Sequence, residues 1–264
     1  MVILITGISS GFGYETARLL AYEGHTVYGT VRREVEQLPS VHYLKVDVRD
    51  REAVNDVVQQ VIEKEGRIDV LVNNAGMGIG GPVEFATEEE VREQMDTNFM
   101  GLVNFVTAVL PHMRKQGSGK IIALSSIGGL MGLPFQGFYS ASKFAIEGYC
   151  EALRLETKKL GIIVTVVRPG DFSTGFTASR KKTPNAEAMK AYQTYAESMG
   201  KVEHDETGGL KPQVLARKIS SIIQKKHPRY GYVVASFEQR LSVLLKRILP
   251  AKWFALILGS YYKL

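Results

Sequence analysis

Short apolar runs rich in β-branched residues alternate along this chain with segments of helical periodicity. Strands joined by helices imply a parallel sheet, and strands that are apolar almost throughout imply that both faces of the sheet are covered. We therefore expect an α/β fold, with a doubly wound parallel sheet in a three-layer α/β/α sandwich. The predicted strands are Val2–Thr6, Thr26–Val31, His42–Val46, Ile68–Val72, Lys120–Leu124 and Ile162–Val167.

The alternation ends after Gly170. A polar segment follows and contains a predicted helix over residues 186–199, whose Met189, Tyr192 and Met199 could turn toward a binding site as a mobile lid. Two further helical stretches complete the chain. The pattern predicts a single domain over residues 1–264, with a substrate lid at about 172–209 and a C-terminal helical extension at about 237–264.

Composition excludes several classes of protein. The chain has 264 residues, 45% of them hydrophobic and 23% charged, as expected for one globular domain or at most two. A single cysteine and five scattered histidines predict no internal disulfide and no structural metal, and the absence of a signal or membrane-spanning run predicts a cytoplasmic protein. The formal net charge is +6, but the basic clusters Arg180-Lys181-Lys182 and Lys225-Lys226-His227 have no interleaved aromatics. We therefore expect these clusters to be solvated faces and expect no nucleic-acid partner.

The first predicted strand leads into the sequence GISSG, from Gly7 to Gly11, which fits two different devices. In α/β hydrolases such a turn presents a nucleophilic serine, here Ser9, but there it follows several strands and an oxyanion loop. A dinucleotide-binding fold instead places its phosphate loop directly after the first strand. Gly7, Gly11 and Gly13 fit this second device, although their spacing differs from the commonest fingerprint.

Further motifs extend this interpretation along the chain. After the glycine loop come Asp47-Val48, Asn73-Asn74-Ala75-Gly76, Asn98, Ser126, Tyr139-x3-Lys143 and Pro169-Gly170. In order and spacing these residues resemble the short-chain dehydrogenase/reductase family, from about residue 2 to residue 174. The segments VYGTVRR, FYSASKFAIEGY and RILPAKWF are similar to its hydroxysteroid and retinol dehydrogenase branch. The resemblance implies a Rossmann-type fold and an NAD(P)-dependent enzyme that interconverts a ketone or aldehyde and its alcohol.

The catalytic residues implied by the resemblance are Asn98, Ser126, Tyr139 and Lys143, with Ser125 as a competing candidate for the serine. Tyr139 and Lys143 lie four residues apart on one predicted helix face, where an ammonium is expected to lower the pKa of the phenol from about 10. The family pattern gives Tyr139 the proton exchange with the substrate oxygen, Ser126 the orientation of that oxygen and Asn98 a water-linked proton relay. Lys143 also binds the nicotinamide ribose in that pattern. An inactive, cofactor-sensing or scaffolding member of the fold is the alternative, and it predicts loss of these residues.

The cofactor is expected to be NADP(H), with NAD(H) as the alternative. A Rossmann domain that prefers NAD usually carries an acid at the end of its second strand, and here that position reads Thr30-Val31-Arg32-Arg33. Because a guanidinium offers two parallel donors to a phosphate, Arg32 is predicted to bind the adenosine 2′-phosphate together with Ser10. The nearby acids Glu34 and Glu36 are the reason for keeping NAD(H) as the alternative.

The other predicted cofactor contacts follow from the resemblance. The resemblance gives Asp47 the adenine, with Val48 packing on the ring, and Asp47 could also cap the helix that begins near Asp50, since the two roles are compatible. The remaining contacts are Gly7, Ser9, Gly11, Phe12, Gly13, Arg33, Asn74, Ala75, Gly76, Tyr139, Lys143, Pro169, Gly170, Phe172 and Thr174.

The substrate is expected to be lipophilic, a secondary alcohol or ketone of steroid, retinoid or long acyl type. Flexible methionines and aromatics suit a large apolar ligand, with core filling as the alternative role for each of them. The predicted substrate contacts are Met77, Ser126, Met131, Phe135, Tyr139 and Tyr192. The basic, amphipathic C-terminal tail could cover the pocket, join a subunit interface or make peripheral contact with a membrane. The resemblance further implies a homodimer or homotetramer through helices at about 88–116 and 137–160.

Overall fold

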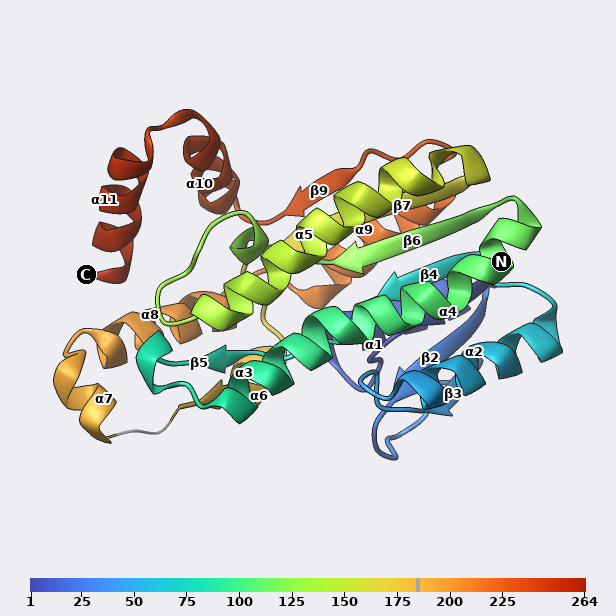
Figure 1. Cartoon of the computed structure of the whole chain (residues 1–264), viewed down its shortest axis with the longest axis horizontal. Helices are drawn as coiled ribbons and strands as arrows, with labels where there is room; N and C mark the ends of the chain where they lie inside the picture. Colours follow the sequence, from blue (N-terminus) through green and yellow to red (C-terminus); the bar gives the residue numbers. More distant parts are fainter. Residues whose placement is uncertain (184–185) are drawn as a thin grey trace.

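The computed structural model describes residues 1–183 and 186–264, without the side chains of residues 186, 188 and 189. Seven strands form one parallel sheet in the order β3-β2-β1-β4-β6-β7-β9 (Figure 1). All six predicted strands are present, with ends shifted by at most two residues, and a seventh strand, β9, was not predicted. The strands are β1 Val2–Ile5, β2 Thr26–Val31, β3 Val41–Lys45, β4 Val70–Asn73, β6 Gly119–Leu124, β7 Ile162–Pro169 and β9 Gly231–Val234.

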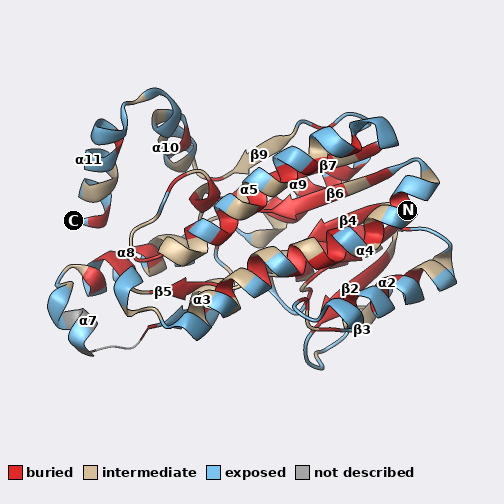
Figure 2. Ribbon diagram, viewed as in Figure 1, coloured by how far each residue is buried: buried red, intermediate tan, exposed pale blue. Residues whose placement is uncertain are grey.

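Helices cover both faces of the sheet, as the apolar strands predicted. One face packs against α1 (Gly11–Tyr22) and α9 (Pro212–Gln224), and the other against α2 (Arg51–Glu65), α4 (Gly101–Gln116) and α5 (Gly137–Thr157). Figure 2 shows the buried residues concentrated in the strands and on the inner faces of these helices. Side chains alternate between the two faces along each strand, so one sheet supplies two separate cores. The predicted three-layer Rossmann-type sandwich is therefore confirmed.

The strand order changes direction between β1 and β4, and the loops that follow these two strands are tied together there. Thr6 Oγ1 accepts hydrogen bonds from the backbone amides of Asn74 and Ala75, both at 2.9 Å. The Asn74 side chain donates to the carbonyl oxygens of Thr6 at 2.9 Å and Gly7 at 2.8 Å. In open α/β sheets ligands bind at such a switch point, at the carboxyl ends of the strands. These bonds therefore fix both walls of the ligand crevice.

Several shorter elements lie outside the sandwich. A small parallel sheet joins β5 (Ile79–Gly80) to β8 (Lys181–Lys182), and the long-range contact of these segments was not predicted. A single turn of π-helix, η2 (Asp96–Met100), connects α3 (Glu88–Met95) to α4. The other short elements are η1 Val83–Phe85, η3 Ile127–Gly129, η4 Lys158–Leu160 and α6 Phe176–Ser179.

The lid and the C-terminal extension differ from their sequence predictions. The single helix expected over 186–199 is two helices, α7 (Ala186–Ala191) and α8 (Tyr195–Thr207). The break lets Tyr192 and Tyr195 pack on Phe135 from two directions, with ring centroids 6.2 Å and 5.1 Å away. The two expected C-terminal stretches are three helices, α9, α10 (Phe237–Ile248) and α11 (Ala251–Tyr262), with β9 between the first two.

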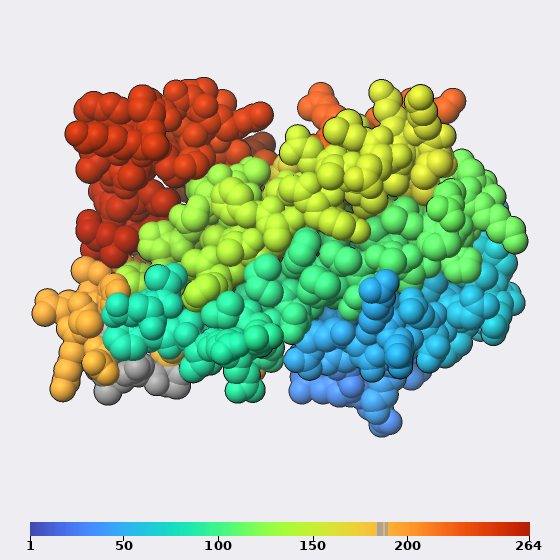
Figure 3. Space-filling model, in the orientation of Figure 1, coloured from blue at the N-terminus to red at the C-terminus, as the bar shows by residue number. Residues whose placement is uncertain are grey.

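The last two helices form one end of the molecule. Figure 3 shows α10 and α11 (red) there, next to the α7–α8 segment (orange). Their outer surface exposes large apolar side chains, which are Leu241, Leu244, Ile248, Trp253 and Leu256. Among the residues that the structure describes, no helix combines the length and the apolar character needed to cross a membrane.

Candidate active site

A cavity of about 930 Å³ extends along the carboxyl ends of the sheet strands. Most of the predicted site residues line it, although they come from loops far apart in the sequence. Those lining it are Gly7, Ser9, Ser10, Gly11, Phe12, Arg32, Val48, Asn74, Ala75, Gly76, Met77, Ser126, Met131, Tyr139, Lys143, Pro169, Gly170, Phe172 and Thr174. In the described part of the chain, no cluster of three or more His, Cys, Asp or Glu could hold a metal ion.

The glycine loop between β1 and α1 has the shape of an anion cradle. Gly7 and Gly11 have φ angles of +70° and +59°, which other residues rarely adopt. A Cβ on Gly13 would lie 2.2 Å from the Gly7 carbonyl oxygen, so Gly13 permits close packing instead of lining the cavity. Ser10 begins α1 without a side-chain cap, which leaves the first amides of the helix available to a ligand.

Ser9 does not have the surroundings of a nucleophile. Its side chain is exposed, and no hydrogen bond joins it to a basic group within residues 1–183 and 186–264. A serine hydrolase needs a general base beside the hydroxyl. The structure therefore favours the phosphate-loop interpretation of GISSG.

At the far end of the cavity, near β2, Arg32 is the charged lining residue. Its neighbour Arg33 is exposed and does not line the cavity, and neither does Glu34. Asp47 is also directed away, because its carboxylate accepts hydrogen bonds from Arg49 and its pKa is lowered chiefly by that contact. The predicted cofactor contacts of Arg33 and of the Asp47 side chain thus find no support.

The helix cap suggested for Asp47 belongs to another residue. Asp50 caps α2, accepting from the amides of Glu52 and Ala53 at 3.1 Å. Val48 is buried and lines the cavity, whereas Asp47 does not.

Ser126, Tyr139 and Lys143 meet at the centre of the cavity. Ser126 caps the η3 turn after β6, where its hydroxyl accepts from the Gly128 amide at 3.0 Å, and its proximity to the Tyr139 phenol lowers the pKa of that group. The competing Ser125 hydroxyl lies against Gly129 and the Lys143 carbonyl of α5, so its geometry favours Ser126 for the oxygen-orienting role. Lys143 Nζ is buried, donates to the Leu124 carbonyl at 2.9 Å and lies 5.7 Å from the centre of the Tyr139 ring.

The electrostatics of this group correct one sequence expectation. Burial raises the pKa of Tyr139 to about 12, with Ser126 and Arg180 lowering it and Glu206 and Asp171 raising it further. Burial also lowers the pKa of Lys143 to about 8, because the charged ammonium is desolvated. The expected lowering of the phenol pKa by Lys143 was wrong for this structure. At neutral pH Tyr139 therefore carries its proton and can donate it.

Asn98 lies behind the cavity, in the π-helical turn η2. Its side-chain oxygen accepts from the Met77 amide at 2.8 Å, and its nitrogen donates to the Met77 carbonyl and to Ser142 Oγ, both at 3.0 Å. These bonds join the loop after β4 to the helix that carries Tyr139. Asn98 does not line the cavity, and its predicted part in a water-linked proton relay stays a prediction.

The structure does not support the prediction that Phe135 and Tyr192 contact the substrate. Neither lines the cavity; with Tyr195 and Met199 they form a separate apolar cluster beside β5. Their aromatic rings pack against each other, so these side chains fill a small core and do not face a ligand. Met199 belongs to this cluster too, and the predicted role of the Met189 side chain lies outside the described residues.

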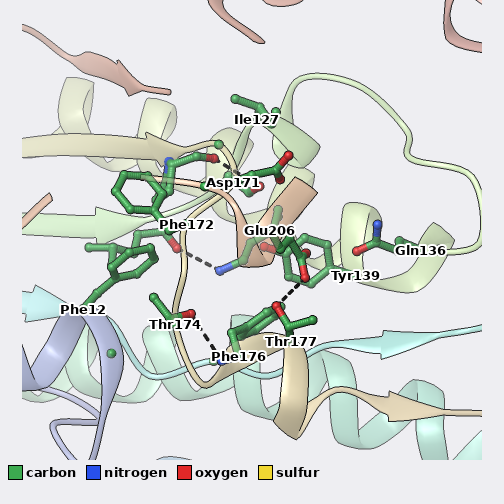
Figure 4. Close-up of a pocket in the computed structure, with 18 of the residues that line it drawn as sticks. Phe12, Ile127, Gln136, Tyr139, Asp171, Phe172, Thr174, Phe176, Thr177 and Glu206 are labelled. Carbon is green, nitrogen blue, oxygen red and sulfur yellow. Dashed lines mark hydrogen bonds between the residues drawn. The ribbon is translucent and has the colours of Figure 1, made fainter. Parts of the chain in front are cut away.

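The C-terminal tail contributes to the cavity wall. Figure 4 looks into the region around Tyr139. The α11 residues that line the cavity are Phe254, Ile257, Leu258, Tyr261 and Tyr262. Of the three roles considered for the tail, covering the pocket is the one visible in this structure.

Sequence reasoning missed several polar residues at this end of the cavity. Asp171, Gln136 and Glu206 line the cavity near Tyr139 (Figure 4). Asp171 had a usable signal, because it directly follows the Pro169-Gly170 pair at the end of a strand. Gln136 and Glu206 had none, since they belong to a loop and to the unpredicted part of α8.

The chain belongs to the short-chain dehydrogenase family, whose sequence profile matches residues 1–185. It is 48% identical to the 3-ketodihydrosphingosine reductase of Bacteroides thetaiotaomicron over 262 residues, which cover 99% of this chain and 97% of that protein. It is 40% identical to human 17-beta-hydroxysteroid dehydrogenase type 1 over 191 residues, 66% of this chain and 58% of the human one. The resemblance to the hydroxysteroid dehydrogenases is thereby confirmed.

Solved structures agree with the fold. A short-chain dehydrogenase from Streptomyces avermitilis superimposes with a TM-score of 0.81 at 30% identity, covering 99% of this chain and 96% of that one. An alcohol dehydrogenase from Thermococcus sibiricus, complexed with 5-hydroxy-NADP, gives a TM-score of 0.72 at 25% identity, with 89% and 96% coverage. Both relatives extend over nearly the whole sandwich.

Proposed function

We propose that this oxidoreductase uses NADP(H) to interconvert a lipophilic ketone and its alcohol. The observation that carries the proposal is the meeting of Ser126, Tyr139 and Lys143 in the same cavity as the glycine loop. A proton donor, an oxygen-orienting hydroxyl and an anion cradle are the parts that such a reaction needs from the protein.

The residues present fit a dinucleotide phosphate cofactor. The uncapped start of α1 and the turn from Gly7 to Phe12 would hold the pyrophosphate, and Arg32 and Ser10 would hold an adenosine 2′-phosphate. Relatives whose structures contain NADP-type cofactors, such as the Thermococcus sibiricus alcohol dehydrogenase and a serine dehydrogenase, support this choice. When bound, the reduced nicotinamide supplies a hydride.

The protein's own part in the reduction is proton transfer and positioning. The substrate carbonyl oxygen would accept hydrogen bonds from Ser126 Oγ and Tyr139 Oη. As the carbonyl carbon gains the hydride, the electron pair of the C=O bond moves to the oxygen, which takes the proton from Tyr139 Oη and becomes the alcohol. The buried Lys143 ammonium opposes the negative charge that is left on the phenol oxygen.

The lining of the outer cavity supports a long apolar substrate. Met131, Leu133, Phe254, Ile257 and Leu258 line the same cavity as Tyr139, and all but Ile257 belong to one apolar cluster. The Bacteroides relative carries the name of a reductase for 3-ketodihydrosphingosine, a long-chain ketone. A long-chain ketone is therefore our proposed substrate class.

A substrate panel tests this proposal directly. We expect kcat/KM for 3-ketodihydrosphingosine, followed by NADPH oxidation, to exceed that for small polar ketones by tenfold or more, since each buried methylene is worth about 0.8 kcal/mol. A steroid ketone in the same panel checks the other lipophilic class. Faster turnover of small polar ketones or sugars would contradict the proposal.

We propose a homodimer or homotetramer that assembles through α4 and α5. On the outer side of α5, Phe144 and Leu155 are 45% and 71% exposed, which is unfavourable for side chains of this size on a monomer surface. Light scattering at micromolar concentration should give at least twice the monomer mass of 29.2 kDa. A monomer mass would rule out this assembly.

A further inference from the structure

Asp171 contributes a carboxylate to the cavity lining near Tyr139. It follows Gly170 at the end of β7, where its backbone amide donates to Gln239 Oε1 at 3.2 Å. Within the described residues its carboxylate takes part in no ion pair. Burial first, and then the carboxylates of Glu206 and Asp205, raise the pKa of Asp171 to about 6, with Gln239 and Arg180 opposing the shift. At neutral pH the group is still mostly ionised.

The neighbouring acids, in contrast, have their charges compensated. Glu206 forms an ion pair with the buried guanidinium of Arg180 and accepts a hydrogen bond from Thr177 Oγ1 at 2.6 Å. Asp205 lies 3.3 Å from Lys201 Nζ. Glu238, a fourth acid that lines the cavity, is exposed to solvent on α10. Among the lining acids that are not exposed, Asp171 is therefore the one without an ion pair inside the described chain.

Gln136 supplies an independent second observation. The residue is only 4% exposed and lines the cavity, yet its side-chain amide makes no hydrogen bond within the part of the chain that the structure describes. Figure 4 shows the amide on the cavity wall, turned toward Tyr139. The amide atoms are not among those that are both fully buried and unpaired, so they keep accessible surface on the cavity side and are free to pair with a polar group of a ligand.

We propose that Asp171 and Gln136 form a headgroup subsite, which selects long-chain ketones that carry an ammonium group close to the carbonyl. This inference rests on the proposed function. Asp171 receives the ammonium, and Gln136 pairs with the remaining polar hydrogens or oxygens of the headgroup. The alkyl chain then extends along the apolar wall made by α11 and by Met131 and Leu133.

An ammonium bound at Asp171 would also change the pKa of Tyr139. Asp171 is one of the groups that raise the pKa of the phenol. An ammonium bound at Asp171 cancels that effect, and so eases release of the phenol proton to the carbonyl oxygen. A ketone without the amine lacks this compensation, and leaves the Asp171 charge desolvated by the bound chain.

The test compares two substrates that differ in one group. 3-Ketodihydrosphingosine, which carries an amine beside its ketone, is assayed against a 3-ketone of equal chain length without the amine. We expect wild-type kcat/KM to favour the amino ketone by about tenfold or more, as for a charge-assisted contact. Asp171→Asn, which keeps the shape of the side chain, should remove most of this preference, because it raises KM for the amino ketone and relieves the desolvation cost that the Asp171 charge imposes on the ketone without the amine.

Two further variants complete the experiment. Glu203→Gln is the matched control: it removes a carboxylate from the same end of the protein, but Glu203 pairs with Lys182 and does not line the cavity. It should keep the wild-type preference. Thermal midpoints check that the variants fold, and if Asp171→Asn does not fold, Gln136→Leu decides in its place and should also reduce the preference.

The outcomes separate the two proposals. Failure of the wild-type protein to reduce either ketone would reject the proposed function itself. Reduction of both ketones with equal kcat/KM, or an unchanged preference in folded Asp171→Asn, would reject the subsite and leave the function standing.

Discussion

Tyr139→Phe is expected to lower kcat for ketone reduction by about a thousandfold, within the range known for loss of a general acid. The substitution removes only the hydroxyl, and the ring keeps its contact with Phe176, whose centroid lies 5.8 Å away. Because the pKa of Tyr139 is about 12, the wild-type phenol is protonated at any pH near neutrality and is ready to donate. The measurement is the rate of NADPH oxidation with saturating ketone.

The control for this variant lies on the same helix. Tyr149 is also on α5 but packs against Phe99, away from the cavity, so Tyr149→Phe should retain wild-type kcat. NADPH binding, measured by fluorescence titration, should be unchanged in both variants, because neither removes a group proposed to hold the phosphates. Near wild-type turnover by Tyr139→Phe would exclude this tyrosine as the proton donor.

Arg32→Ala is expected to shift cofactor preference, lowering the ratio of kcat/KM for NADPH to that for NADH by tenfold to about a hundredfold. Arg32 follows the end of β2 and lines the cavity, and among the described residues no acid lines it beside Arg32 to bond a ribose hydroxyl. The variant loses contact with a phosphate that only NADPH carries, so the NADPH values should fall while the NADH values stay almost constant. Steady-state kinetics with each cofactor measure the ratio.

Arg33→Ala provides a matched control one residue away. It removes an equal charge from the same loop, but Arg33 does not line the cavity. If the preference depends on a specific contact, this variant should keep the wild-type ratio; if it depends only on the general positive potential, both variants should shift the ratio equally. An unchanged ratio in Arg32→Ala would remove the basis for assigning the phosphate to this residue.

The amino-acid sequence by itself determined the fold class and the location of most of the site. Apolar runs and amphipathic segments are set by the alternation of side chains along a strand and around a helix, so six sheet strands could be predicted within two residues. The glycine positions carried similar information, because Gly7 and Gly11 have backbone angles that other residues rarely adopt. The parallel topology then brings the strand ends to one edge, and with them Ser126 and Tyr139.

Only the tertiary structure decided which side chains face the cavity and how they ionise. Phe135 and Tyr192 were predicted as substrate contacts, yet they pack on each other in a small apolar cluster. This packing depends on the interruption of the helix expected over 186–199, which ends before Tyr192 and begins again at Tyr195. The pKa of Tyr139 moves upward and not downward, because burial disfavours the charged phenolate more than the Ser126 hydroxyl and the Arg180 charge favour it. Asp171 and Gln136 come from loops 35 positions apart, and neither has a local pattern that records their shared cavity. Periodicity and backbone constraint are local properties, whereas burial and electrostatic pairing arise only when distant segments are packed together.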